Sequence, residues 1–222
     1  MNLNLLITIL NRGNLTKARS LYEKNGISPL ITMLGSGTAT PGQLRMLGLD
    51  ASEKALIAGV INGSEIHSFF NRAKREMMID VPGNGVMMTV PIKSIAGGKT
   101  LAYMTNGGNL DNEKPDMVFN NELIVVVLNS GFTDDVMDTA REAGAGGGTV
   151  IHAKGTGAKL ASKFFGVNLA EEKEVLFIAE RLDKKSKIMQ AIAEKMGPQT
   201  SAGAISFSLP ISEIAGIRNL ED

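Results

Sequence analysis

Residues 90–98 read VPIKSIAGG, and residues 209–217 read LPISEIAGI. The phrase Pro-Ile-x-x-Ile-Ala-Gly therefore occurs twice, with every identical residue in step. The identical pairs are Pro91/Pro210, Ile92/Ile211, Ile95/Ile214, Ala96/Ala215 and Gly97/Gly216. This agreement indicates an internal repeat, and a repeat decides how the rest of the chain is divided.

The beginning of each half also repeats. LLITILNRG (5–13) and LIVVVLNSG (123–131) are apolar runs rich in branched residues and ended by Asn and Gly, a pattern that predicts a strand followed by a turn. Apolar residues then recur at helical spacing in LTKARSLYEKNG (15–26) and TDDVMDTAREAG (133–144). We therefore expect a strand and a helix at the start of each copy.

Residues typical of helix caps and helix stops mark the ends of these helices. Gly26 and Gly144 stand where a helix stop belongs. In the second copy Thr133 predicts an N-cap, and the two aspartates after it face the positive end of the helix dipole.

The rest of each half continues in parallel. The expected elements are a second strand (28–34 and 148–155), a glycine-marked loop (35–42 and 155–166), a third strand (53–63 and 172–182), a helix (64–77 and 184–196) and a last strand (84–91 and 203–210). The order β-α-β-β-α-β is that of the ferredoxin-like fold, a four-stranded antiparallel sheet with both helices on one face. The sequence therefore predicts an α+β protein made of two tandem ferredoxin-like units. Repeat 1 spans residues 1–97, a linker spans 98–121 with short edge strands at 101–104 and 117–119, and repeat 2 spans 122–222.

The apolar runs LLITIL and LIVVVL do not alternate with polar residues. A sheet with one solvated face normally shows such alternation. We therefore expect the second face of each sheet to be covered, either by the sister half or by another copy of the chain, and we favour an oligomer of several chains.

Composition excludes several classes of protein. The 222 residues include no cysteine, which rules out disulfides, thiolate zinc sites and cysteine nucleophiles and suits a cytoplasmic location. The formal net charge is +0, so nothing draws the chain to nucleic acid. No apolar run approaches the roughly 20 residues of a membrane span, and no secretory signal pattern opens the chain.

The residues that could act in catalysis or bind a cofactor or metal form no recognisable active site. AGAGGGT (143–149) lies between a predicted helix and a predicted strand, the reverse of the dinucleotide fingerprint, so a helix stop and close strand packing explain its glycines. His67 and His152 have no partner at a metal-ligand spacing. No base and acid are arranged around Ser36. The sequence therefore predicts a protein that is not an enzyme and holds no metal.

Two glycine segments remain as candidate ligand sites. Gly35, Ser36 and Gly37 in the first half match Gly155, Thr156 and Gly157 in the second. Backbone with two nearby glycines can curve its N–H groups around an anion, and Lys159 is one of the lysines near the second segment. A plain loop explains the same glycines equally well.

The order of elements and two short motifs resemble those of a known protein family. The order of elements, a strand ending in KGTG (154–157), a strand ending in LP (209–210) and a short closing helix are similar to the PII nitrogen-regulatory signalling proteins. The resemblance is clearest over residues 122–218 and reaches the first half mostly through the internal repeat.

The resemblance implies a fold and a function. PII proteins are ferredoxin-like units that assemble as trimers with their sheets inward, bind ATP or ADP in clefts between subunits, and dock on a transporter or an enzyme through a loop after the second strand. On this chain the loop base maps to residues 35–37 and 155–157. The phosphate-gripping turn maps to 82–85, with Gly83 and Gly85, and to 197–203, with Gly197, and a basic residue of the C-terminal segment maps to Arg218.

The chain also departs from the family pattern. The lysine that closes the phosphate turn is replaced by Val86 and Ala204, and Thr38 and Ala158 stand where many members have an arginine. The loop contains no tyrosine, so uridylylation is not expected. Two other readings stay open: a ferredoxin-like structural or metal-tolerance protein without a nucleotide site, and a small-molecule enzyme using a dimer cavity.

Overall fold

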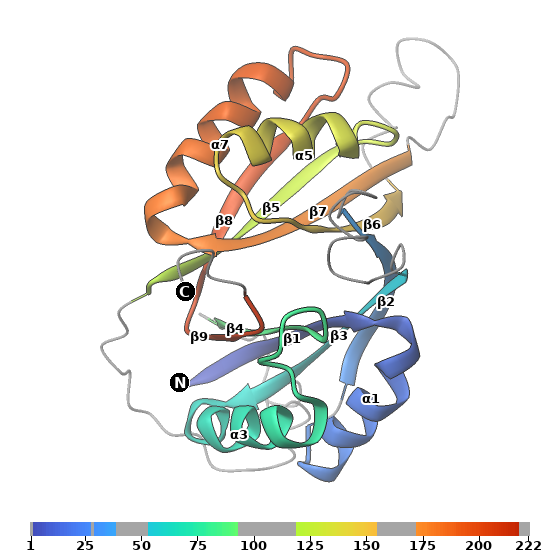
Figure 1. Ribbon diagram of the computed structural model, residues 1–222, viewed down its shortest axis with the longest axis vertical. Helices are drawn as coiled ribbons and strands as arrows, with labels where there is room; N and C mark the ends of the chain where they lie inside the picture. Colours follow the sequence, from blue (N-terminus) through green and yellow to red (C-terminus); the bar gives the residue numbers. More distant parts are fainter. Residues whose placement is uncertain (1, 28, 39–52, 93–118, 155–171, 218–222) are drawn as a thin grey trace, which may run out of the picture. The chain divides into compact units, whose positions relative to one another are not determined.

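The computed structural model describes residues 2–27, 29–38, 53–92, 119–154 and 172–217 (Figure 1). Repeat 1 contains β1 (Leu3–Asn11), α1 (Leu15–Lys24), β2 (Pro29–Gly37), β3 (Glu53–Asn62), α3 (Ile66–Met77) and β4 (Gly85–Pro91). Repeat 2 contains β5 (Asn121–Asn129), α5 (Thr133–Glu142), β6 (Thr149–Lys154), β7 (Glu172–Arg181), α7 (Leu182–Met196), β8 (Ile205–Ile211) and a short β9 (Glu213–Ala215). Each repeat thus has the expected order β-α-β-β-α-β.

The strands of each repeat lie in the same spatial order. The first repeat runs β2-β3-β1-β4, and the second, read from its second strand, runs β6-β7-β5-β8. The first and third strands of each repeat therefore occupy the middle of its sheet. β1 is antiparallel to both of its neighbours, with Leu6 opposite Gly59 of β3 and opposite Thr89 of β4. This is the ferredoxin-like arrangement, and the predicted fold class is confirmed.

The chain forms two compact units. Unit 1 consists of Met1–Leu34, Ser52–Asn121 and Pro210–Asp222, and unit 2 consists of Gly35–Ala51 and Glu122–Leu209. Each unit is therefore one repeat plus a short segment of the other.

The borrowed segments act as extra edge strands. In unit 1, β9 pairs antiparallel with β4, placing Met87 opposite Ala215 and Thr89 opposite Glu213. In unit 2, the end of β2 pairs with β6, placing Ser36 opposite Val150. The Pro-Ile-x-x-Ile-Ala-Gly phrase of repeat 2 thus forms a strand, and the expected closing helix is wrong. In the first copy of the phrase, Pro91 ends β4 and residues 93–97 lie outside the described residues.

The two helices of each unit cover one face of its sheet (Figure 1). In unit 1 the core between them includes Leu6 and Leu10 of β1, and in unit 2 it includes Ile124 and Val126 of β5. Because side chains alternate along a strand, Ile7 and Ile9 point to the opposite face, as does Val125. Both faces of the central strands are therefore apolar, as their sequences predict.

Other local expectations are partly met. Gly144 ends α5 with φ +107°, and a Cβ on Gly148 would lie 2.9 Å from the Phe177 carbonyl oxygen, so AGAGGGT is a helix stop followed by close strand packing. The predicted N-cap at Thr133 is wrong. Phe132 occupies the cap, and the Thr133 hydroxyl instead donates to Glu174 Oε2 at 2.6 Å. An N-cap hydroxyl would accept from N–H groups of the first turn, whereas here the Thr133 hydroxyl donates its proton to a carboxylate in a charge-assisted hydrogen bond.

One buried tyrosine distinguishes the core of unit 1 from that of unit 2. The Tyr22 hydroxyl and Thr8 Oγ1 lie 2.8 Å apart, and the Tyr22 ring meets Phe69 edge to face at 5.4 Å. Burial raises the pKa of Tyr22 far above its ordinary range, so the hydroxyl stays neutral and can donate. The corresponding positions of repeat 2 are Val126 and Ala140, so the second core dispenses with this hydrogen bond.

We expect Tyr22→Phe to lower the free energy of unfolding of unit 1 by about 1–2 kcal/mol, because it removes the partner of the buried Thr8 hydroxyl. Urea unfolding measures this loss. The double variant Thr8→Val/Tyr22→Phe removes both polar groups and should recover part of the stability. A double variant as unstable as the sum of the two single variants would contradict this account.

Candidate functional site

A corner made by three chain segments recurs in both units. In unit 1, Asn11 at the end of β1 accepts a hydrogen bond from Lys54 Nζ at 2.6 Å and donates its amide to the Gly83 carbonyl at 3.4 Å. In unit 2, Asn129 at the end of β5 accepts from Lys173 Nζ at 2.5 Å and donates to the Ser201 carbonyl at 2.9 Å. We call each set the Asn–Lys corner: an asparagine, a lysine and the turn before the last strand of the repeat.

The turn of the first corner is held by its own backbone. The Asn84 N–H donates to the Val81 carbonyl at 3.1 Å, and the Asn84 side chain donates to the Met78 carbonyl at 3.0 Å. Gly85 ends the turn with φ +142°, and a Cβ there would lie 2.5 Å from the Ile9 carbonyl oxygen. Only glycine therefore lets this turn approach β1 so closely.

The turn of the second corner uses different residues for the same task. Both the N–H and the hydroxyl of Thr200 donate to the Gly197 carbonyl at 2.9 Å, and the Gly203 N–H donates to the Thr200 carbonyl at 3.1 Å. Gly83, Gly85 and Gly197, the positions to which the phosphate turn was mapped, thus all belong to the two turns.

The lysine of the first corner is partly buried. Burial lowers the pKa of Lys54, and among the described residues no acidic neighbour contributes to the shift. The hydrogen-bond partner that holds its ammonium is a neutral amide. A partly buried cation with a neutral partner gains from an anion, which supplies a charge-assisted hydrogen bond.

Sequence reasoning found the turns and missed the side chains beside them. Asn11 and Asn129 were read only as strand ends, and Lys54 and Lys173 only as the first residues of a strand. Their signal was nevertheless present, because LN closes the first strand and EK opens the third strand in both copies.

The other predicted site residues are elsewhere. Gly35, Ser36 and Gly37 were expected in a loop, but they form the end of β2, so that prediction is wrong. A Cβ on Gly35 would lie 2.3 Å from the Val150 carbonyl oxygen, and the close approach of β6 gives this glycine a packing reason. The structure does not place these three residues in the Asn–Lys corners. Gly155, Thr156, Gly157, Lys159 and Arg218 lie outside the described residues.

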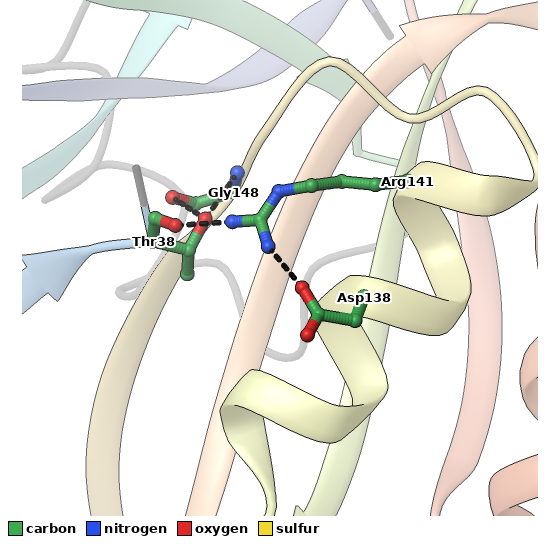
Figure 2. A network of polar contacts seen from close by, with 4 residues as sticks. All are labelled: Thr38, Asp138, Arg141 and Gly148. Atoms are coloured by element: carbon green, nitrogen blue, oxygen red, sulfur yellow. Dashed lines mark hydrogen bonds and ion pairs between the residues drawn. The ribbon is translucent and has the colours of Figure 1, made fainter. Parts of the chain in front are cut away.

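Beyond β2, Thr38 is fixed to unit 2 by a compact polar network (Figure 2). The Thr38 N–H donates to the Gly148 carbonyl at 3.1 Å, and the Gly148 N–H donates to Thr38 Oγ1 at 2.9 Å. Arg141 donates to the Thr38 carbonyl and forms an ion pair with Asp138 at 2.8 Å. Thr38 thus anchors the end of β2.

A buried carboxylate lies at the start of α5. Glu174 accepts hydrogen bonds from Ser130 Oγ at 3.2 Å, the Gly131 N–H at 3.3 Å and Thr133 Oγ1 at 2.6 Å, and His152 Nδ1 lies 3.4 Å away. With three donors, the carboxylate is satisfied by its own surroundings and holds the first turn of the helix. Among the described residues no group of three or more acidic or histidine side chains could bind a metal ion.

Comparison with protein-family models finds a match in the second half of the chain. Residues 121–221 match the family model described as Nitrogen regulatory protein P-II. No curated protein sequence matches the chain. No helix in the described segments is long and apolar enough to cross a membrane.

Two solved structures are similar over almost the whole chain. A crystal structure of an unknown protein from Galdieria sulphuraria is 12% identical, with 94% of this chain and 98% of that chain covered and a TM-score of 0.28. The acetolactate synthase small subunit from Thermotoga maritima is 10% identical, with 97% and 92% covered and a TM-score of 0.25. At these scores neither likeness supports a conclusion about this chain.

We expect Thr38→Val to lower the stability of unit 2 by about 1 kcal/mol, because the Gly148 N–H loses its acceptor. Thr38→Ser keeps the hydroxyl and is the matched control. Hydrogen exchange at the Gly148 amide reports the change directly. Equal protection of this amide in the valine and serine variants would show that the hydroxyl does not hold it.

Proposed function

We propose that the chain is a non-enzymatic regulatory protein that binds a small anionic effector at its Asn–Lys corners, because residues 121–221 match the P-II family model. The signal then passes by contact with a partner protein. The proposal includes a cytoplasmic location and a role in nitrogen metabolism, with a transporter or an enzyme as the partner and an oligomer, such as a trimer, as the working assembly.

The observation that carries the proposal is the recurrence of the corner. Asn11 and Asn129 are half-buried at the ends of the sheet strands, and each binds both a lysine and the carbonyl of a turn. Purely structural side chains diverge between the repeats, as Thr8/Val126 and Tyr22/Ala140 do. The lysine and the asparagine instead kept their type and their contact, which supports a shared ligand.

We propose an adenine nucleotide, ATP or ADP, as the effector. Its phosphates are the anionic groups that an ammonium and the N–H groups of a glycine-containing turn recognise. Gly83 and Gly85 supply such a turn beside Lys54, and Gly197 begins the corresponding turn beside Lys173. The glycine segments at 35–37 and 155–157, with Lys159, and Arg218 remain proposed contacts of the same ligand.

We expect the full chain to bind ATP or ADP in calorimetric titration, and Lys54→Met/Lys173→Met to weaken binding at least roughly tenfold, because each lost charge-assisted bond is worth about 1.5–3 kcal/mol. Lys187→Met, on the exposed side of α7, is the matched control and should bind like the parent chain. If neither nucleotide binds the parent chain, the structural or metal-tolerance reading without a nucleotide site takes its place. If binding is unchanged in the double variant, the ligand lies away from the corners.

The pH dependence of binding follows from Lys54. Only the ammonium form attracts an anion, and burial lowers the pKa of this lysine. Affinity at the first corner should therefore be full below that pKa and fall as pH rises through it, beginning below the value of about 10.4 of an exposed lysine. Titrations of Lys173→Met between neutral and alkaline pH isolate the first corner. The same titration of Lys54→Met/Lys173→Met should lack this fall, and a fall of equal size in that variant would assign it to another group.

A further inference from the structure

Two apolar side chains point outward from the turn of the first Asn–Lys corner. Met78 is 57% exposed and Val81 is 47% exposed, whereas Ile79 between them is buried in the core of unit 1. Single exposed apolar residues are common on protein surfaces, but two on one short turn beside a candidate site point to an interaction. We call Met78 and Val81 the apolar pair.

The backbone conformation of Met78 makes its exposure unusual. Met78 caps the C-terminal end of α3 with φ 52° and ψ 42°, the left-handed conformation that glycine most often adopts at the end of a helix. In the part of the chain that the structure describes, it is the one residue other than glycine with a positive φ. A strained residue whose side chain lies outside the core points to a function other than packing.

The turn holds the apolar pair in a fixed position. The Met78 carbonyl accepts hydrogen bonds from the Val81 N–H and from the Asn84 side chain, both at 3.0 Å. Gly216, just after β9, packs against the same turn, because a Cβ there would lie 2.6 Å from the Ile79 carbonyl oxygen. A rigid, preformed surface of this kind loses little conformational entropy when a ligand binds to it.

The apolar pair lies close to the cation of the first corner. Val81 is two residues from Gly83, so their Cα atoms are at most about 7 Å apart. The Gly83 carbonyl accepts from Asn11, which also holds Lys54 Nζ at 2.6 Å. Apolar surface and positive charge therefore meet at one turn, which fits a ligand with an anionic end and an apolar or aromatic body.

The second corner lacks this pair at the equivalent positions. The repeat aligns Met78 with Gly197 and Val81 with Thr200, without an insertion in either turn. Gly197 has no side chain, and the Thr200 hydroxyl donates to the Gly197 carbonyl at 2.9 Å. The two corners thus share an asparagine and a lysine and differ in the surface beside them.

We propose that Met78 and Val81 make the first corner a site for an anion with an aromatic body, the base of a nucleotide, while the second corner binds the anionic group alone. This inference rests on the proposed function, because it takes both corners to be anion sites. Valine supplies an apolar contact surface, and the methionine sulfur makes favourable contacts with aromatic rings. The flexible thioether side chain can also adapt to a planar ring without a change in the turn that carries it.

Calorimetric titration with ATP and with inorganic tripolyphosphate tests the inference, because tripolyphosphate has the phosphate chain and no base. Both ligands are titrated against Lys173→Met, which isolates the first corner. We expect the further substitutions Met78→Gly and Val81→Thr to weaken ATP binding at least roughly fivefold and to leave tripolyphosphate binding unchanged. Both new residues are those of the second corner, and glycine adopts the left-handed conformation without a Cβ penalty, so the turn is kept.

Two controls separate the apolar contact from charge and from the other corner. Asp80→Asn changes the charge of the same turn and keeps the apolar pair, so it should shift both affinities in the same direction. In Lys54→Met, which isolates the second corner, Met78→Gly and Val81→Thr should leave ATP binding unchanged.

Three results would overturn the inference while the anion sites stand. These are an equal weakening of ATP and tripolyphosphate binding by Met78→Gly/Val81→Thr, an unchanged ATP affinity in that variant, and ATP binding that survives in Lys54→Met but not in Lys173→Met. The last result would make the second corner the nucleotide site. If the parent chain binds neither ATP nor tripolyphosphate, the proposed function fails and the inference fails with it.

Discussion

The antiparallel pairing of β1 with both β3 and β4 is the constraint on which the first unit depends. It places Asn11 opposite Lys54 and Leu10 opposite Gly85, so the end of the first strand meets the beginnings of the third and the last. Any chain with this strand order brings a turn and two strand ends together at one corner. Asn11 and Lys54 meet at this corner by a hydrogen bond, while Leu10 beside them belongs to the core under the helices.

The second repeat keeps this frame and changes its contents. Tyr22 with Thr8 gives way to Ala140 with Val126, which replaces a buried hydrogen bond by apolar packing. Glu174, in turn, anchors the start of α5 through three donors. Two cores with different interiors can thus support the same backbone, because the ferredoxin-like frame requires the apolar pattern and the pairing rather than particular side chains. Against this background the retained Asn–Lys contact stands out.

Much of the fold could be predicted from the sequence, since the elements follow hydrophobic periodicity and the repeat tests each assignment twice. The sequence indicates the helix ends at Gly26 and Gly144 because glycine is the residue that favours the positive φ of a helix stop. Both glycines have positive φ, 71° and 107°. Two features were missed for a shared physical reason. The strand character of residues 35–37 and of Glu213–Ala215 depends on partners distant in the chain, Val150 and Met87 among them, and no local pattern contains that information.

The candidate site was harder to read because its lysine does not lie in the turn that it serves. Val86 and Ala204 replace the lysine that closes the family's phosphate turn, and reading the turn alone argues against phosphate binding. Pairing in the sheet brings Lys54 and Lys173 to the same corner from the start of the third strand. In the proposed site the cation comes from a neighbouring strand, since what an anion requires is a charge at a position in space and not at a position in the sequence. The proposed effector binding therefore does not depend on a lysine within the turn.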